Sequence, residues 1–228
     1  MKVEIKGYIV SNDDKCIYDY FGIGATCPQD ILNAIHEANS ETLEVEITTC
    51  YGGDIFAGSS IYAALRGYAG GVRISVTGLA ASAASVIAMA GQSEMAPTAM
   101  MMVHRVSSIA AGNYHDMERT SNSLQQADKA IAAAYVAKSG MEEKDAIKMM
   151  DAETWITAKQ AVELGLVDRV SEAAIPQLVN AYGGMLPRAV VEKTRAMLAV
   201  QKTEPPKGQP DKAILLAKAK LSLAEKAI

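Results

Sequence analysis

Short runs of alternating or apolar residues recur along the first 170 residues, and segments with helical spacing separate most of them. The alternating and apolar runs predict strands. These expected strands cover residues 1–10, 16–23, 43–47, 72–77, 100–104 and 166–170, and the first two are expected to flank an Asn12-Asp13-Asp14 turn.

The segments between the strands have apolar residues at helical spacing, and glycine or proline marks many of their ends. Helices are expected from Pro28, over 55–68, from Ser82 to near Gly91, and over 157–165. A long helix is expected from Tyr114, with a break at Ser139-Gly140 and a shorter helix from near Glu142. This alternation of strands and helices favours βαβ units and an α/β layer architecture.

The chain is expected to divide into a core domain, residues 1–182, and a C-terminal extension, residues 183–228. The extension is expected to contain a helix over 188–201, a Pro-rich linker over 203–210 and an amphipathic terminal helix over 211–228. The terminal helix could dock on its own domain or on a partner.

Composition narrows the function classes. The formal net charge of −4 and the lack of a basic stripe outside the extreme C-terminus disfavour nucleic-acid binding. The apolar run 78–91 is too short for a bilayer, and the N-terminus has the pattern of a strand rather than a signal peptide. Cys16, Cys27 and Cys50 lack metal-ligand spacing and predict reduced thiols. We therefore expect a cytoplasmic protein that binds no metal.

Ser82 lies where the expected strand ending at Thr77 leads through Gly78-Leu79-Ala80-Ala81 into the small-residue helix. Backbone N–H groups are unpaired at such a helix start, and they can stabilise an oxyanion. Ser85 lies one turn further into the helix, and the pair Ser59-Ser60 lies within another helix. Ser82 is therefore the expected nucleophile.

His104 ends the expected strand 100–104 and is the candidate general base, because the imidazole pKa lies near neutrality. His36 and His115 are expected to be solvated. The N–H groups of Gly53 and Ala83 are candidates for an oxyanion hole. The residues alone leave the third member of a triad open among Asp54, Asp151 and Glu153.

Four blocks in this order resemble the Clp protease proteolytic subunit family, and most closely its phage-encoded branch of head maturation proteases. The blocks are Tyr51-Gly52-Gly53-Asp54 with Ser60-Ile61-Tyr62; Gly78 to Ser82 with Ala90-Gly91; Met102-Val103-His104; and 161–168. The resemblance runs from about Glu44 to Val170. Cys50-Tyr51 replaces the Ser-Pro that usually precedes the family's glycines.

This resemblance implies a repeated ββα spiral fold, shared by Clp and crotonase proteins, with a helical C-terminal extension. It assigns the nucleophile to Ser82, the base to His104, the acid to Glu153 with Asp151 in reserve, and the oxyanion donors to Gly53 and Ala83. It also implies that Ile109, Ala110, Ala111 and Gly112 line the substrate and join rings.

The resemblance further implies a ring-like homo-oligomer that acts on protein substrates, such as phage scaffold or capsid proteins in the host cytoplasm or prohead. No cofactor is expected. The chain has no Walker-type phosphate loop, so any ATP dependence would come from a separate AAA+ unfoldase.

Two other functions compete with a Ser-His-acid endopeptidase. One is a non-catalytic ring or scaffold subunit of the same fold, and the other is a crotonase-type acyl-CoA enzyme. A Ser-Lys peptidase is disfavoured because no lysine lies between Lys15 and Lys129.

Overall fold

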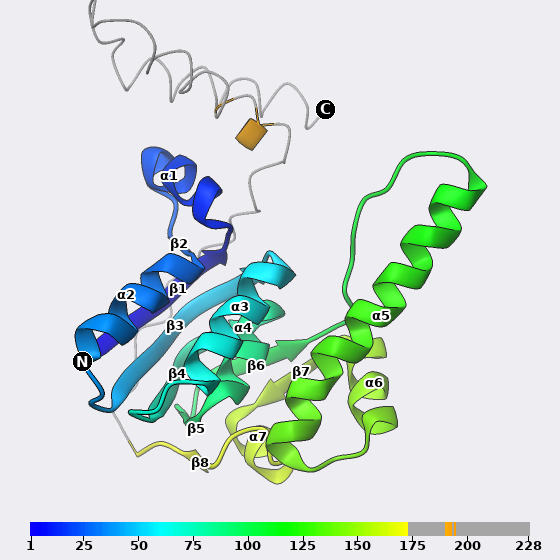
Figure 1. Cartoon of the computed structure of the whole chain (residues 1–228). Helices are drawn as coiled ribbons and strands as arrows, with labels where there is room; N and C mark the ends of the chain where they lie inside the picture. Colours follow the sequence, from blue (N-terminus) through cyan, green and yellow to red (C-terminus); the bar gives the residue numbers. More distant parts are fainter. Residues whose placement is uncertain (173–189, 193, 195–228) are drawn as a thin grey trace, which may run out of the picture.

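A computed structural model describes residues 1–172, 190–192 and 194 of the chain (Figure 1). Residues 190–192 and 194, the described part of the expected helix 188–201, are helical. The expected domain boundary near 182, the Pro-rich linker 203–210 and the terminal helix 211–228 lie outside the described residues.

One sheet organises the described part of the chain (Figure 1). Its strands are β1 (Lys2–Ile9), β2 (Ala25–Thr26), β3 (Leu43–Gly53), β4 (Val72–Ala81), β5 (Gln92–Met95), β6 (Met100–Val103), β7 (Thr154–Thr157) and β8 (Arg169–Val170). Five of them follow β2 in the order β2-β1-β3-β4-β5-β8, all in parallel pairs, while β6 pairs with the end of β4. The β6–β7 pair is antiparallel.

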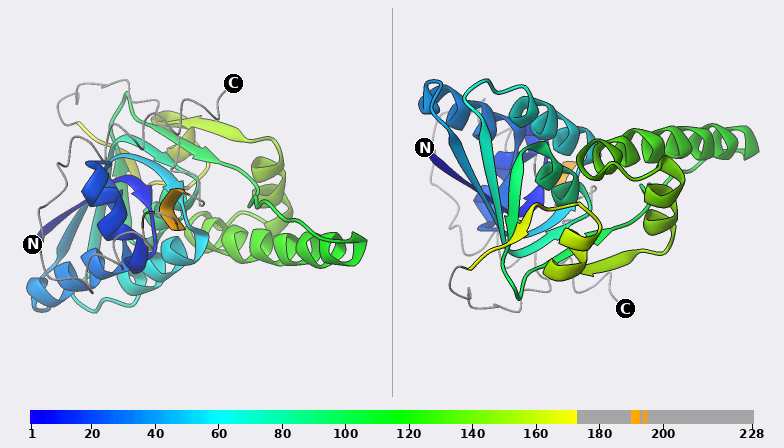
Figure 2. Two further views of the ribbon diagram at one scale, coloured as in Figure 1. Left: turned by 90° about the horizontal axis from the view of Figure 1, so that it is seen from above. Right: turned by 90° about the horizontal axis from the view of Figure 1, so that it is seen from below.

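Helices connect these strands and confirm the predicted α/β class. They are α1 (Asn12–Phe21), α2 (Pro28–Ala38), α3 (Ile55–Arg66), α4 (Ala83–Ile87) with the 3₁₀ turn Ala88–Ala90, α5 (Tyr114–Ser139), α6 (Glu143–Asp151) and α7 (Ala158–Glu163). Helix α2 contacts α3, and α3 contacts α4. The long helix α5 projects from the body of the molecule (Figures 1 and 2).

The expected strand over 16–23 and the expected turn at Asn12-Asp13-Asp14 are both wrong, because residues 12–21 form helix α1. The hydroxyl of Ser11 accepts a hydrogen bond from the N–H of Asp14 and caps the first turn. Gly22 ends the helix in the left-handed conformation at φ 68°. The two caps stabilise a helix whose inner face buries Ile17 and Tyr18.

Helix α4 and the 3₁₀ turn after it lie in the core, where Ala84, Ile87 and Met89 are fully buried against the sheet, α3 or α5. Small side chains allow this close approach, and the Cβ of Ala83 leaves no room for a methyl group on Gly58 of α3. The expected Ser82 helix is therefore present, but it is short and ends in a 3₁₀ turn before Gly91.

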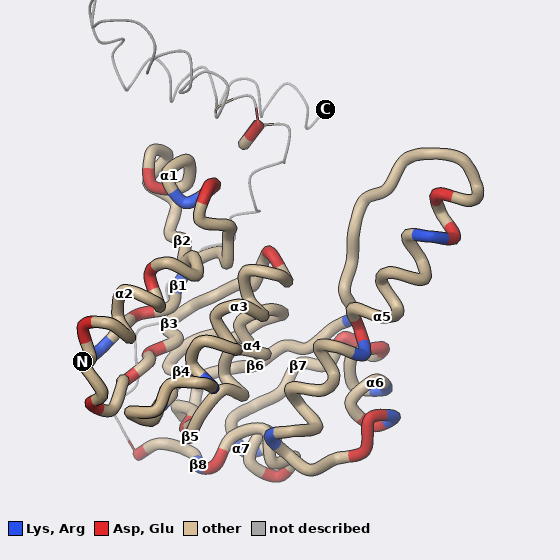
Figure 3. The backbone as a smooth tube through the Cα atoms, viewed as in Figure 1, with Lys and Arg blue, Asp and Glu red and all other residues tan. Residues whose placement is uncertain are grey.

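Charged residues of both signs are interspersed over the described chain (Figure 3). The three cysteines are unpaired with one another. None of the described helices is both long and apolar enough to cross a membrane.

Candidate active site

Ser82 occupies a strained turn between β4 and α4. Its backbone has φ 54° and ψ −123°, a conformation that non-glycine residues rarely adopt and that costs about 1–3 kcal/mol. The Ser82 N–H donates to the carbonyl of Met102 at 2.9 Å, which ties the turn to β6. The Ser82 side chain makes no capping bond to α4, so its hydroxyl points elsewhere.

The Ser82 hydroxyl meets the imidazole of His104. Oγ of Ser82 lies 2.8 Å from Nε2 of His104, and both residues are half-buried. The sheet explains the contact, because β4 and β6 pair in parallel with Ala81 opposite Met102, and the two residues lie at or just beyond the ends of these strands. A neutral imidazole protonated on Nδ1 can accept the serine proton through Nε2. His36 and His115 are exposed, as expected.

Two glycines bring β3 against the Ser82 turn. Gly52 has φ 80°, and a Cβ built there would lie 2.6 Å from the Cβ of Ser82 and 2.9 Å from the nitrogen of Ala83. Gly53 has φ 145°, and a Cβ there would lie 2.3 Å from the carbonyl oxygen of Ile9. Only glycine fits either position, so the two backbones approach closely.

The proposed oxyanion donors border one cavity with the serine. Ala83 is the first residue of α4, and its N–H has no acceptor within the helix. Gly53, Ser82, Ala83 and His104 all line a cavity of about 80 Å³. Both donor residues therefore border the same cavity as the Ser82 hydroxyl.

Two of the three acid candidates have other partners. The carboxylate of Asp54 caps α3 and accepts hydrogen bonds from the N–H groups of Phe56 and Ala57 at 2.8 and 2.9 Å. The carboxylate of Asp151 accepts from Nε of Arg105 at 2.7 Å, and this bond lowers the pKa of Asp151.

His104 and Glu153 each lie one residue beyond the last pair of the β6–β7 ladder. In the antiparallel β6–β7 pair, Val103 lies opposite Thr154. Glu153 has an unusual φ of 47°. Within the described residues, no hydrogen bond joins the Glu153 carboxylate to His104. The structure thus brings the two strand ends together at Val103 and Thr154, but it does not join the side chains of His104 and Glu153.

The rest of the cavity wall is largely apolar, with Tyr135 as its buried polar member. Its hydroxyl lies 2.8 Å from Oγ of Ser85, which donates to the carbonyl of Ser82 at 2.6 Å. Burial raises the pKa of Tyr135 to about 12, so the phenol stays protonated near neutrality. The remaining side chains that line the cavity are Ile55, Val86, Arg105, Val106, Ser107 and Ile131.

The competing serines are placed differently from Ser82. Ser85 is fully buried, and its hydroxyl is engaged by Ser82 and Tyr135. Ser59 and Ser60 are exposed on α3, where the Ser60 hydroxyl donates to the carbonyl of Phe56. Of these serines, Ser82 is the one whose hydroxyl contacts a histidine in the described structure.

The expected substrate-lining segment 109–112 is an exposed part of the loop between β6 and α5. It does not border the cavity at Ser82, and Ile109 is fully exposed. Ala110 instead lines a groove of about 910 Å³ along α5, together with Met117 and Leu124. The part of this loop that does border the cavity at Ser82 is Arg105 to Ser107, directly after His104 in the chain. Sequence reasoning missed these three residues.

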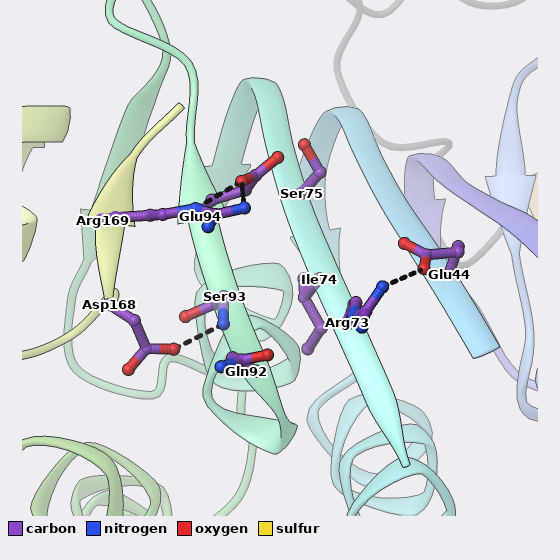
Figure 4. A pocket seen from close by; sticks show the side chains of 9 residues that line it. All are labelled: Glu44, Arg73, Ile74, Ser75, Gln92, Ser93, Glu94, Asp168 and Arg169. Atoms are coloured by element: carbon purple, nitrogen blue, oxygen red, sulfur yellow. Dashed lines mark hydrogen bonds and ion pairs between the residues drawn. The ribbon is translucent and has the colours of Figure 1, made fainter. Parts of the chain in front are cut away.

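A separate cavity of about 390 Å³ lies over the other end of the sheet (Figure 4). Its lining includes Arg73 near the start of β4, whereas Ser82 follows the end of that strand. The charged side chains there include two pairs: Arg73 with Glu44, and Arg169 with Glu94. This cavity has no part in the geometry around Ser82.

Comparison with known proteins gives a consistent result. The family model described as Clp protease matches residues 25–174. An ATP-dependent Clp protease proteolytic subunit of Bacteroides fragilis is 31% identical over 122 residues, which are 52% of this chain and 59% of that protein. A proteolytic subunit 1 of Streptomyces avermitilis is 33% identical over 125 residues, 54% of this chain and 58% of that protein. The match thus spans less than two thirds of these relatives. Because the family model covers more than half of the chain, this protein belongs to the Clp protease family.

Proposed function

We propose that this protein is a serine endopeptidase that cleaves peptide bonds through an acyl-enzyme on Ser82. The 2.8 Å contact between Oγ of Ser82 and Nε2 of His104 is the observation that carries the proposal. The strained backbone of Ser82 and the nearby N–H groups of Gly53 and Ala83 support it. A serine that only stabilised the fold would not require a strained backbone that directs its hydroxyl to a histidine.

The reaction begins when His104 removes the proton of the Ser82 hydroxyl and the oxygen attacks the peptide carbonyl. The N–H groups of Gly53 and Ala83 bind the resulting oxyanion, and each donor contributes about 3 kcal/mol. When the C–N bond breaks, the imidazolium returns its proton to the leaving amine. His104 then deprotonates a water molecule, which attacks the ester carbonyl. When the ester C–O bond breaks, the imidazolium protonates the leaving Ser82 oxygen, and the acid product is released.

We assign the third role, orientation of His104 through Nδ1–H, to Glu153. The pairing of Val103 with Thr154 supports this assignment, because His104 and Glu153 are the next residues beyond that pair. A shift of the Glu153 side chain on substrate binding would complete the hydrogen bond. Asp151, the reserve candidate, already bonds to Arg105.

For partners, we propose further copies of the chain in a ring and an AAA+ unfoldase. The similar proteins of B. fragilis and S. avermitilis are named as proteolytic subunits of an ATP-dependent protease. Protein substrates follow from the proposed chemistry. The resemblance to phage head maturation proteases points to scaffold or capsid proteins in the host cytoplasm or prohead.

Hydrolysis of a fluorogenic peptide library by the full chain tests the proposal. We expect Ser82→Ala and His104→Ala to lower kcat by about 10⁶-fold, and Glu153→Gln by about 10⁴-fold. The matched controls Ser60→Ala and His36→Ala should retain wild-type rates. Activity that survives Ser82→Ala would overturn the proposal. Wild-type rings without hydrolysis would favour a scaffold subunit, and turnover of acyl-CoA esters alone would favour a crotonase-type enzyme.

A further inference from the structure

The loop that follows His104 is attached to two helices by carboxylates. Asp128 of α5 is only 5% exposed, and both of its oxygens accept hydrogen bonds from this loop. Oδ1 accepts from the N–H of Val106 at 2.8 Å, and Oδ2 accepts from Nη1 of Arg105 at 2.9 Å. A buried carboxylate with this pattern fixes both the backbone and a side chain of the segment next to His104.

Arg105 also reaches a second helix. Its Nε donates to Asp151, the last residue of α6, at 2.7 Å. The bond to Asp151 is the main cause that raises the pKa of Arg105 above its ordinary value. The guanidinium therefore remains charged and bridges α5 and α6 at all physiological pH values.

This bridge joins the two strand ends that carry the proposed base and acid. Arg105 follows His104 directly, and Asp151 precedes Glu153 by two residues. The β6–β7 ladder ends at Val103 and Thr154, so strand pairing does not continue to His104 or Glu153. Beyond that point, the contacts of Arg105 hold the two segments together.

Asp128 also connects the two sides of the cavity at Ser82, one formed by helix α5 and the other by the loop after His104. Ile131 and Tyr135 lie three and seven residues further along α5, on the same face, and both border the cavity at Ser82. Val106, whose N–H bonds to Asp128, borders the same cavity from the loop. Asp128 thus fixes the distance between the two walls.

We propose that Arg105 and Asp128 are positioning residues that hold the imidazole of His104 against the hydroxyl of Ser82. Their effect on catalysis rests on the proposed peptidase function, whereas their effect on the placement of His104 does not. Neither residue needs to contact the reacting atoms. The bridge acts through the backbone next to His104.

The test compares two variants, Arg105→Gln and Asp128→Asn, with the control Arg169→Gln. Both test variants remove a charge; the first shortens the side chain, and the second keeps its size. The control breaks an Arg–Glu pair of similar length that lies at the other end of the sheet (Figure 4). All proteins are studied as the full chain, at a temperature where circular dichroism shows them folded.

The first measurement is the rate at which diethyl pyrocarbonate modifies each histidine, read by peptide mass spectrometry. The exposed His36 and His115 are internal references in the same molecule. In the wild type, His104 should react more slowly than both, because it is half-buried and bonded to Ser82. In Arg105→Gln and Asp128→Asn its rate should approach theirs, and in Arg169→Gln it should stay slow.

The second measurement is peptide hydrolysis. We expect kcat to fall about 10- to 100-fold in both test variants, in line with a displacement of the base by about 1 Å. For Asp128→Asn, KM should stay within about threefold, because Asp128 is not among the described residues that border the cavity at Ser82.

Unchanged protection of His104 in the two variants would overturn the inference, whether or not hydrolysis falls. Exposure of His104 together with loss of kcat would support it. Exposure of His104 in a protein whose wild type hydrolyses no peptide would support the positioning role and refute the proposed function.

Discussion

The close approach of Gly52 to Ser82 allows a sharp test of the site geometry. In Gly52→Ala the new Cβ would lie 2.6 Å from the Cβ of Ser82, 2.7 Å from the carbonyl oxygen of Ala81 and 2.9 Å from the nitrogen of Ala83. Ordinary contacts begin at 3.4 Å, and two of these three neighbours are backbone atoms. The Ser82 turn must therefore move away from β3.

Gly71 provides the matched control, because it has the same φ of 80° and a Cβ added to it would meet nothing within 4 Å. Gly71→Ala should cost about 1–2 kcal/mol of folding stability from the left-handed backbone alone. Gly52→Ala carries the same cost and about 1–3 kcal/mol more for overpacking. A displacement of the nucleophile by about 1 Å should lower its reactivity about 100-fold.

The assay is the rate of Ser82 labelling by a fluorophosphonate, measured beside thermal unfolding. Gly71→Ala should melt earlier than the wild type and label at the wild-type rate. Gly52→Ala should melt earlier still and, while folded, label about 100-fold more slowly. Equal labelling rates in the two variants would refute the reasoning that Gly52 fixes the position of Ser82.

Three other substitutions test single contacts by thermal or urea unfolding. Asp54→Ala removes the cap of α3 and should cost about 1 kcal/mol, and a loss within error would contradict the capping role. Tyr135→Phe removes the buried bond to Ser85 and should also cost about 1 kcal/mol, and a neutral result would mean that this bond adds no net stability. Burial raises the pKa of Asp168, but hydrogen bonds from Lys138 and a backbone N–H outweigh it and lower the pKa below its ordinary value. Ionised Asp168 therefore stabilises the fold above its ordinary pKa, and this contribution disappears as the pH falls through the lowered value. Asp168→Asn should destabilise the protein near neutral pH and have little effect in strong acid, and a loss that does not depend on pH would contradict this account.

Much of the fold could be predicted from local patterns. The helices beginning at Pro28, Ile55 and Tyr114 start at the expected residues, and the last two also end close to them, because proline, capping side chains and glycine mark these helix ends. The prediction for the segment 16–23 is wrong because its apolar and aromatic residues fit a strand as well as a helix. The caps Ser11 and Gly22 are the signal that favours the helix.

The proximity of Ser82 and His104 could be predicted from the sequence, because both residues lie at the ends of expected strands. Ser82 and His104 follow strands that pair in parallel, so the pattern of elements brings them together. The bridge made by Arg105 was not predictable, because Asp128 and Asp151 lie on two helices whose packing a sequence pattern does not specify. The same limit left Glu153 and Asp151 unresolved as acids.

Reaction of the full chain with a fluorophosphonate, read as intact mass, tests the central claim most directly. The account predicts one adduct per wild-type chain, located by peptide mapping at Ser82, and none in Ser82→Ala. An adduct that persists in Ser82→Ala, or an assembled wild-type protein that takes up no probe, would contradict it.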